Sequence, residues 1–145
     1  MKIMAVDFGD ARTGLAACDK IEMFAAPLGV ITEYNFDRTV LKVANAAEEY
    51  GIEMIVVGHP VNMDGTRGDR AKKCELFADE LRKIVSIPVQ LWDERSTTVL
   101  AHTYLNEGNV KGKKKKAVVD EVAATIILES FLDYRENLRK KGELK

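Results

Sequence analysis

Three short apolar segments open the pattern of hydrophobic and polar positions along the chain. They cover residues 2–7, 13–19 and 26–32, and polar residues separate them. The first segment ends at Asp7, and the DFGD turn after it contains Gly9, which adopts backbone angles that other residues resist. Because the links between the segments are short, the pattern predicts three strands that pair antiparallel as a meander.

The pattern then changes to a helical period. From about residue 38 to residue 49, apolar residues recur every three or four positions, which predicts an amphipathic helix. Asn35 or Asp37 is suited to cap the start of this helix, and Gly51 to close its end. Its apolar stripe consists of Val40, Leu41, Val43, Ala44 and Ala47.

Two further strands surround a second helix. The apolar run at residues 53–58 is typical of a strand covered on both faces, and residues 89–94 predict another strand after Pro88. The helix between these strands has an inner face of Ala71, Cys74, Phe77, Ala78, Leu81 and Ile84.

The last part of the chain predicts two helices. They cover residues 96–107 and about 117–137, with a positively charged break at residues 108–116 between them. The order β-β-β-α-β-α-β-α-α indicates an α/β fold with a mixed five-stranded sheet, in which three antiparallel meander strands precede βαβα units and helices cover both faces. We expect a single domain over residues 1–137 and a charged tail over residues 138–145.

Composition excludes several classes of protein. The 145 residues carry 22 Lys and Arg against 23 Asp and Glu, so the chain is not a basic nucleic-acid coat, and any affinity for nucleic acid must come from local patches. No apolar run approaches the roughly 20 residues of a membrane helix, and Asp7 comes too early for a signal peptide. Cys18 and Cys74 have no metal-ligand spacing, so we expect reduced, buried thiols in a cytoplasmic protein without membrane contact.

Acidic residues mark a candidate site. Asp7 ends the first predicted strand, and Asp93 and Glu94 end the fifth, where the ligand sites of open α/β sheets gather. Asp120, on the last predicted helix, lines up with the buried stripe, where a carboxylate is costly unless it is paired or binds a cation. Converging carboxylates without a Cys or His cluster favour Mg²⁺ or Mn²⁺, and two such ions can support phosphodiester hydrolysis.

Each acidic position also has a purely structural interpretation. Asp7 could simply begin the DFGD turn, and one of Asp93 and Glu94 is a solvated strand end. Asp120 would cap the last helix if that helix began later than the pattern predicts.

A run of lysines precedes Asp120. Lys113, Lys114, Lys115 and Lys116 predict a flexible cationic arm that binds nucleic acid beside the acidic site. The alternative is a solvated loop that binds nothing.

Four arginines are further candidates for nucleic-acid binding: Arg12, Arg67, Arg70 and Arg95. Arg67 and Arg70 flank a glycine-rich turn and are placed to contact phosphates, although Arg70 equally fits an ordinary first helical turn. His59 and His102 lack metal-ligand spacing, and we interpret them as a loop residue and a helix residue.

Four segments, in order, carry a resemblance to a known family: AVDFGDARTGLA at 5–16, VVGHPVNMDGTRGDRA at 56–71, DERSTT at 93–98 and DEVAATIILES at 120–130. They resemble the YqgF/RuvX family of Holliday-junction-resolvase-like proteins, also described as pre-16S rRNA nucleases, over nearly the whole chain. The resemblance implies a ribonuclease H-like fold and a catalytic, metal-binding triad of Asp7, Glu94 and Asp120. It also implies a cytoplasmic bacterial protein that acts on structured RNA or DNA. Ser96 and His59 depart from the residues common in the family, and neither belongs to the triad.

These features favour a metal-dependent endonuclease that hydrolyses phosphodiester bonds of structured nucleic acid. The expected cofactor is Mg²⁺ or Mn²⁺, the expected substrate is the 5′ end of pre-16S rRNA, and ribosomal precursor particles are expected partners. The alternatives are a resolvase of branched DNA and a nucleic-acid-binding module without catalysis. An actin-like sugar kinase or ATPase also opens with a strand and a D-x-G turn, but that architecture needs two such domains.

Strand geometry separates Asp93 from Glu94. Successive side chains of a strand point to opposite faces, so only one of the two can enter a site on the face that the last helix covers. If the fourth strand lies between the first and the fifth, the outer two are about 10 Å apart, which favours the longer Glu94 side chain. We therefore predict that Glu94 enters the site and that Asp93 faces away.

Overall fold

The computed structural model describes residues 1–94 and 112–142, and over residues 112–121 it describes the backbone alone. Its elements, in chain order, are β1 (Ile3–Asp7), β2 (Arg12–Cys18), β3 (Ala25–Thr32), α1 (Phe36–Glu49), β4 (Met54–His59), α2 (Asp69–Ile84), β5 (Val89–Asp93) and α4 (Gly112–Lys140). The helix predicted over residues 96–107 lies outside the described residues.

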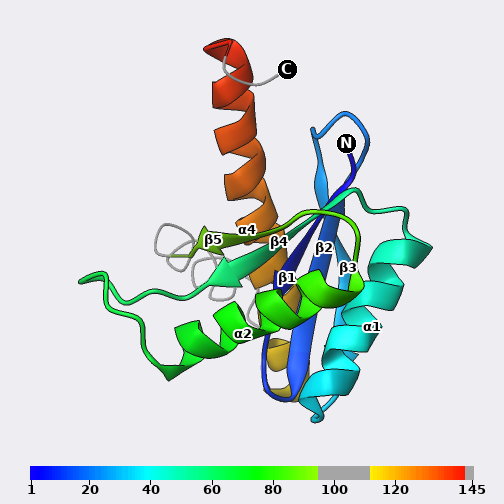
Figure 1. Ribbon diagram of the computed structural model, residues 1–145, viewed down its shortest axis with the longest axis vertical. Helices are drawn as coiled ribbons and strands as arrows, with labels where there is room; N and C mark the ends of the chain where they lie inside the picture. The colour runs from blue at the N-terminus through cyan, green and yellow to red at the C-terminus, as the bar shows by residue number, and fades with distance from the viewer. Residues whose placement is uncertain (95–111, 143–145) are drawn as a thin grey trace.

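One mixed sheet organises the molecule, with strand order β3-β2-β1-β4-β5 (Figure 1). β1 pairs antiparallel with β2, and β2 with β3, which confirms the predicted meander. β4 lies parallel to β1, and β5 lies parallel to β4. The short predicted links therefore produced antiparallel pairs, and the helical crossovers produced parallel ones.

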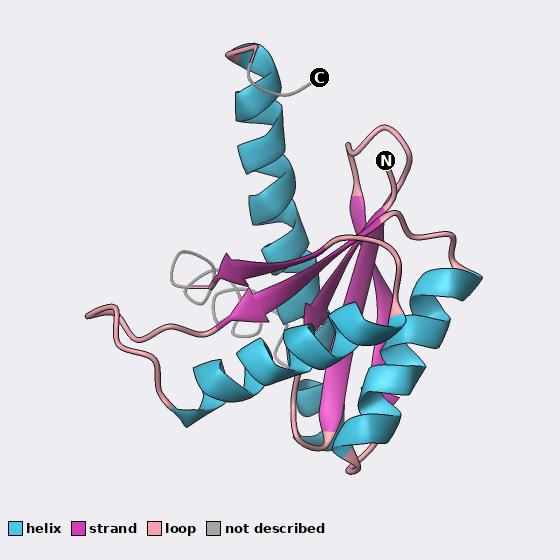
Figure 2. Cartoon of the chain, in the orientation of Figure 1, coloured by secondary structure: helices cyan, strands magenta, loops and turns pink. Residues whose placement is uncertain are grey.

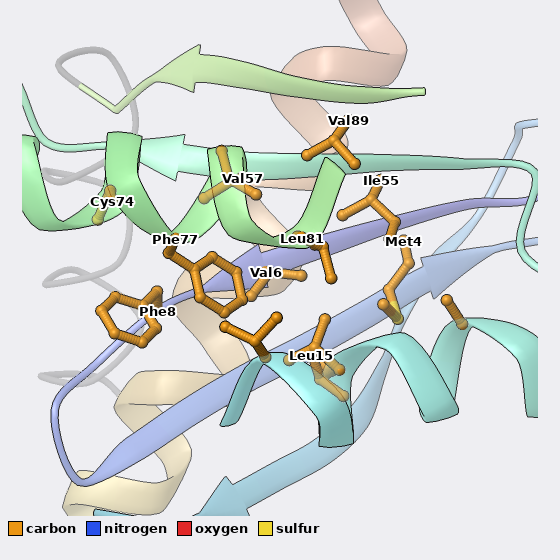
Figure 3. Close-up of a cluster of buried hydrophobic side chains, with 14 of the residues drawn as sticks. Met4, Val6, Phe8, Leu15, Ile55, Val57, Cys74, Phe77, Leu81 and Val89 are labelled. Atoms are coloured by element: carbon orange, nitrogen blue, oxygen red, sulfur yellow. The ribbon is translucent and has the colours of Figure 1, made fainter. Parts of the chain in front are cut away.

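Helices cover both faces of the sheet, as predicted (Figure 2). On one face, Met4 and Val6 of β1 belong to a core that α1 and α2 cover (Figure 3). On the other face, Ile3 and Ala5 pack with buried residues of α4. This alternation follows from the two-residue period of a strand. Each large side chain buried completely in these cores, such as Phe77, contributes about 1.5–3 kcal/mol of transfer free energy.

Local sequence signals account for the limits of α1. The Asn35 side chain accepts a hydrogen bond from the backbone N–H of Arg38 at 2.9 Å, so Asn35, and not Asp37, is the capping residue. Gly51 follows the helix with a φ of 65°, a left-handed conformation that glycine adopts without strain.

The last helix is longer than predicted. α4 begins at Gly112 and ends at Lys140, whereas the pattern predicted about 117–137. Residues 113–116 are therefore helical, and the predicted break and flexible arm at these lysines are wrong. Lysine is a good helix former, so a run of lysines extends a helix whose later turns are held by packing on the sheet. Asp120 lies well inside the helix, which removes the interpretation of Asp120 as its cap.

The cysteines and the membrane prediction can also be compared with the structure. Cys18 and Cys74 are buried free thiols, as expected. Within the described part of the chain, no helix has the length and apolar character needed to cross a bilayer.

Candidate active site at the carboxyl edge of the sheet

The carboxyl ends of β1, β4 and β5 lie side by side. Val6 of β1 pairs with Val57 of β4, so Asp7 is level with Gly58. On the other side of β4, His59 pairs with Asp93, and the backbone N–H of Glu94 donates to the His59 carbonyl at 3.1 Å. The strand register thus brings the ends that carry Asp7 and Glu94 to one edge, with β4 between them.

Glu94 and Asp93 lie on opposite faces. Leu91 packs against the core under α1 and α2, whereas Trp92 packs against the core under α4. Alternation therefore gives Asp93 the face of Leu91 and Glu94 the face of Trp92, which is also the face of Ala5 and hence of Asp7. β5 itself ends at Asp93, one residue earlier than predicted.

Gly58 makes room for Glu94 above β4. A Cβ atom on Gly58 would lie 2.9 Å from the Glu94 carboxyl carbon and 2.6 Å from the Cδ1 atom of Ile127 in α4. The Glu94 side chain therefore covers Gly58, the β4 residue level with Asp7, and bridges part of the gap between β5 and β1. Sequence reasoning treated Gly58 only as the end of an apolar run. The signal that could have identified it is a glycine one residue before the end of a strand whose preceding residues, Ile55–Val57, are apolar and buried.

Both carboxylates are largely removed from solvent. The Asp7 side chain is 10% exposed. Burial raises the pKa of Glu94, and the nearby charges of Arg70 and His59 act in the opposite direction. Burial also raises the pKa of the Cys74 thiol to about 12, with smaller upward contributions from Glu94 and Asp7. One thiol on α2 thus experiences the field of both carboxylates.

Arg70 reaches the same edge from the first turn of α2. Its Nη2 atom donates to the Phe8 carbonyl at 3.1 Å and lies 3.6 Å from Oδ1 of Asp7. Arg70 is therefore more than the ordinary first-turn residue that the sequence allowed. Sequence reasoning predicted a phosphate contact at Arg70 and missed its contact with Asp7.

Arg67 and His59 share a partner in Glu75 of α2. Arg67 Nη1 donates to one Glu75 oxygen at 2.7 Å, and His59 Nε2 lies 2.8 Å from the other. The hydrogen bond from His59 is the main cause that lowers the pKa of Glu75. His59 is the last residue of β4, so its interpretation as a loop residue is wrong. These two contacts bind the end of β4 and the loop after it to α2. His59, which makes one of them, also accepts the backbone hydrogen bond from Glu94.

α4 runs across the sheet toward this edge. Arg135 binds Glu22 in the β2–β3 loop, with Nε 2.5 Å from Oε1, whereas Ile127, about two turns earlier, packs over Gly58. Asp120 stands another two turns earlier and, seven positions from Ile127, on the same side of the helix axis. The helix therefore carries position 120 toward the carboxyl edge, while the Asp120 side chain lies outside the described residues.

The remaining predicted contacts can be placed only in part. Arg12 begins β2 directly after the DFGD turn, where a Cβ on Gly9 would collide with the Arg12 carbonyl oxygen. This close approach explains why glycine occupies the turn. Arg95 lies outside the described residues, and Lys113–Lys116 are described only as helical backbone.

The donor set of the site fits a hard cation. Asp7 and Glu94 offer carboxylate oxygens, the ligands that Mg²⁺ and Mn²⁺ prefer, and a cation would offset the cost of burying them. Among the side chains that the structure describes, no three His, Cys, Asp or Glu residues form a ready metal cluster. Only two of the three predicted ligands, Asp7 and Glu94, are among those side chains, because the Asp120 side chain is not described. Two carboxylates alone do not make a group of three.

The strand order of the sheet and the two helical layers define the fold class of the protein. The structure matches that of RuvC from Thermus thermophilus with a TM-score of 0.58, at 12% identity, over 100% of this chain and 99% of RuvC. It matches the Holliday junction resolvase of fowlpox virus with a TM-score of 0.54, at 14% identity, over 92% of this chain and 99% of the viral protein. At these identities the likeness concerns the fold, and it confirms the predicted ribonuclease H-like fold.

The sequence comparisons then define the family. Residues 1–134 match the RuvX family, described as Holliday junction resolvase, and the chain belongs to this family. A relative from Halothermothrix orenii, named "Putative pre-16S rRNA nuclease", is 43% identical over 95% of this chain and 99% of its own length. A relative of the same name from Acetivibrio thermocellus is 42% identical over 92% of this chain and 96% of its own length. The predicted resemblance to the YqgF/RuvX family is thereby confirmed.

Proposed function

We propose that the protein is a metal-dependent endonuclease that hydrolyses phosphodiester bonds of structured nucleic acid. The observation that carries this proposal is the partly buried Glu94 carboxylate, which lies over Gly58 at the level of Asp7 and on the same face of the sheet. A buried and a partly buried carboxylate at the carboxyl ends of neighbouring strands cost stability and would repel a phosphate, so they favour a cation-dependent reaction over simple nucleic-acid binding.

Asp7, Glu94 and Asp120 are the residues that would hold Mg²⁺ or Mn²⁺. Two such ions, when bound, would polarise the phosphodiester and stabilise the charge on the attacking and leaving oxygens. The carboxylates themselves fix the position of the reaction at the sheet edge. Arg12, Arg67, Arg70 and Arg95, with Lys113–Lys116, would bind and orient the phosphates on either side of the cleaved bond.

The proposed substrate is the precursor of 16S rRNA, cleaved near its 5′ end. The relatives from H. orenii and A. thermocellus carry the name of a pre-16S rRNA nuclease, and their similarity covers nearly the whole chain. We place this activity in the cytoplasm and on ribosomal precursor particles, where such a precursor is processed.

Resolution of branched DNA is the second candidate. It is favoured by the description of the family as a Holliday junction resolvase and by the fold shared with RuvC. RNA and DNA substrates share the phosphodiester chemistry of the site, so the choice between them depends on the surface that binds the strands.

A cleavage assay with matched variants tests the proposal. End-labelled pre-16S leader RNA and a four-way DNA junction would be incubated with the protein, with Mn²⁺ present or removed by chelation. We expect Glu94→Gln to lose nearly all Mn²⁺-dependent cleavage and Asp93→Asn, its neighbour on the opposite face, to keep a substantial part. Cleavage of the junction but not of the RNA would select the second candidate. Binding without any cleavage of either would refute the proposed activity.

A further inference from the structure

Arg70 holds an unusual position beside the proposed metal site. Its Nη2 atom lies 3.1 Å from the carbonyl oxygen of Phe8, which accepts its hydrogen bond, and 3.6 Å from Oδ1 of Asp7. The second distance is an ion-pair distance and exceeds the range of a hydrogen bond. The guanidinium is therefore anchored to a neutral backbone oxygen and acts on Asp7 through its charge.

The charge of Arg70 acts on both carboxylates of the site. It lowers the pKa of Glu94, against the effect of burial, and its effect is larger than that of His59, the other charge that lowers this pKa. The same guanidinium acts on Cys74, one turn further along α2, against the fields of Asp7 and Glu94. Arg70 thus supplies positive charge where a bound divalent cation would supply it.

Arg70 is also placed to leave this position. When Arg70 turns away, its one hydrogen bond, to the Phe8 carbonyl, is exchanged for contacts with a phosphate, and no hydrogen bond with Asp7 has to break. The Arg70 side chain is 59% exposed. It borders a cavity of about 310 Å³ that is lined by Phe8, Gly9, Asp10, Asp69, Arg70 and Lys73.

We propose that Arg70 is a built-in counter-ion that competes with divalent cations for Asp7 and that turns to a nucleic-acid phosphate when a cation binds. This inference rests on the proposed function, which assigns the two carboxylates to the metal. Its consequence is a coupling between metal and substrate: nucleic acid that engages Arg70 raises the affinity for metal, and metal raises the affinity for nucleic acid by the same factor. The protein alone then binds metal weakly, and the site is completed with its substrate.

Titration of Mn²⁺ by calorimetry, without nucleic acid, tests the competition directly. Removal of the charge in Arg70→Gln should lower the dissociation constant for Mn²⁺ about fivefold, the effect of one screened charge near a site at the protein surface. Arg70→Lys keeps a charge and should stay within about twofold of the unsubstituted protein. The matched control is Lys73→Gln, which removes a charge from the next turn of α2, where Lys73 is paired with Asp10 at 2.6 Å. Its affinity should also change by less than about twofold.

The coupling gives a second readout. A short duplex that stays intact in the cleavage assay should tighten Mn²⁺ binding by the unsubstituted protein and by Lys73→Gln, and should have a smaller effect on Arg70→Gln. Unchanged or weaker Mn²⁺ binding by Arg70→Gln would overturn the inference, as would equal tightening in Arg70→Gln and Lys73→Gln. If the unsubstituted protein binds Mn²⁺ and cleaves RNA or junction DNA while Arg70→Gln binds Mn²⁺ no better, only the role of Arg70 fails. If none of the variants binds Mn²⁺ and no substrate is cleaved, the proposed function fails and the inference fails with it.

Discussion

Gly58→Ala is the substitution that most directly tests how Glu94 reaches the site. The new Cβ atom would lie 2.9 Å from the Glu94 carboxyl carbon, whereas ordinary contacts of a Cβ begin at 3.4 Å. The carboxyl group must then move by about 0.5 Å, and Ile127 Cδ1, at 2.6 Å, by about 0.8 Å, as the differences from 3.4 Å show. Both atoms are at the ends of flexible side chains, so we expect a cost near the lower end of the 1–3 kcal/mol typical of overpacking, or about 3 °C in Tm.

Catalysis should suffer more than stability. A displacement of a reacting group by a fraction of an ångström to 1 Å can reduce the rate by up to about 10²-fold. We therefore expect Gly58→Ala to lose about 10- to 100-fold in Mn²⁺-dependent cleavage while its circular dichroism stays unchanged.

A double variant separates the two contacts of the new methyl group. Ile127→Val removes the Cδ1 atom and so relieves the contact with α4, but leaves the contact with Glu94. In Gly58→Ala/Ile127→Val, the loss of Tm should be smaller than the sum of the two single losses, because the substitutions are in contact. Cleavage should remain low. Recovery of cleavage in the double variant would show that the loss came from a shift of α4, and near-normal cleavage by Gly58→Ala would refute the placement of Glu94 in the site.

Three further predictions concern Asp120, the lysines and Glu22. Asp120→Asn should abolish Mn²⁺-dependent cleavage and keep or raise Tm in metal-free buffer, because repulsion from the other carboxylates is relieved; lost helicity would contradict this. Replacement of Lys113–Lys116 by Ala should flatten the slope of the logarithm of the nucleic-acid association constant against the logarithm of the salt concentration by about 1.5 units. The reason is that four consecutive helical positions spread around the axis, so about two would face the nucleic-acid strand. An unchanged slope would mean that the lysines bind nothing. Burial acts to raise the pKa of Glu22, but hydrogen bonds from Arg135, the amino group of Met1 and Arg139 outweigh it and lower the pKa from 4.5 to about 2. The ionised form is therefore the stabilising one, so Glu22 should contribute about 2–3 kcal/mol above pH 4.5 that is lost as the pH falls toward 2, and acid unfolding of Glu22→Gln should lack this component.

The sheet could be predicted because its signals are local. Apolar segments of strand length, a helical stripe and a capping Asn35 each depend on residues close in sequence, and the structure bears them out. Alternation along β5 also predicts that Asp93 and Glu94 face opposite sides, whereas the side that each one faces is known only from the packing of Trp92 in the structure. The predicted start of α4 is wrong because a run of lysines has the charge that is typical of a loop and the propensity of a helix.

The contacts inside the site could not be predicted in the same way. They join segments that are far apart in the sequence, and the sequence does not show which of these segments lie close together in space. The role of Gly58 requires β4 to lie between β1 and β5 and α4 to press Ile127 onto the same residue. The contact of Arg70 with Asp7 depends on how the loop after β4 delivers the first turn of α2 to the DFGD turn. Gly58 has no reactive side chain, yet it leaves the space that the Glu94 carboxyl group occupies. Arg70 was expected to contact phosphate, yet it brings a positive charge to Asp7. The acidic residues can therefore be recognised from the sequence, whereas the residues that place and balance them become visible only when the strand order and the helix contacts are known.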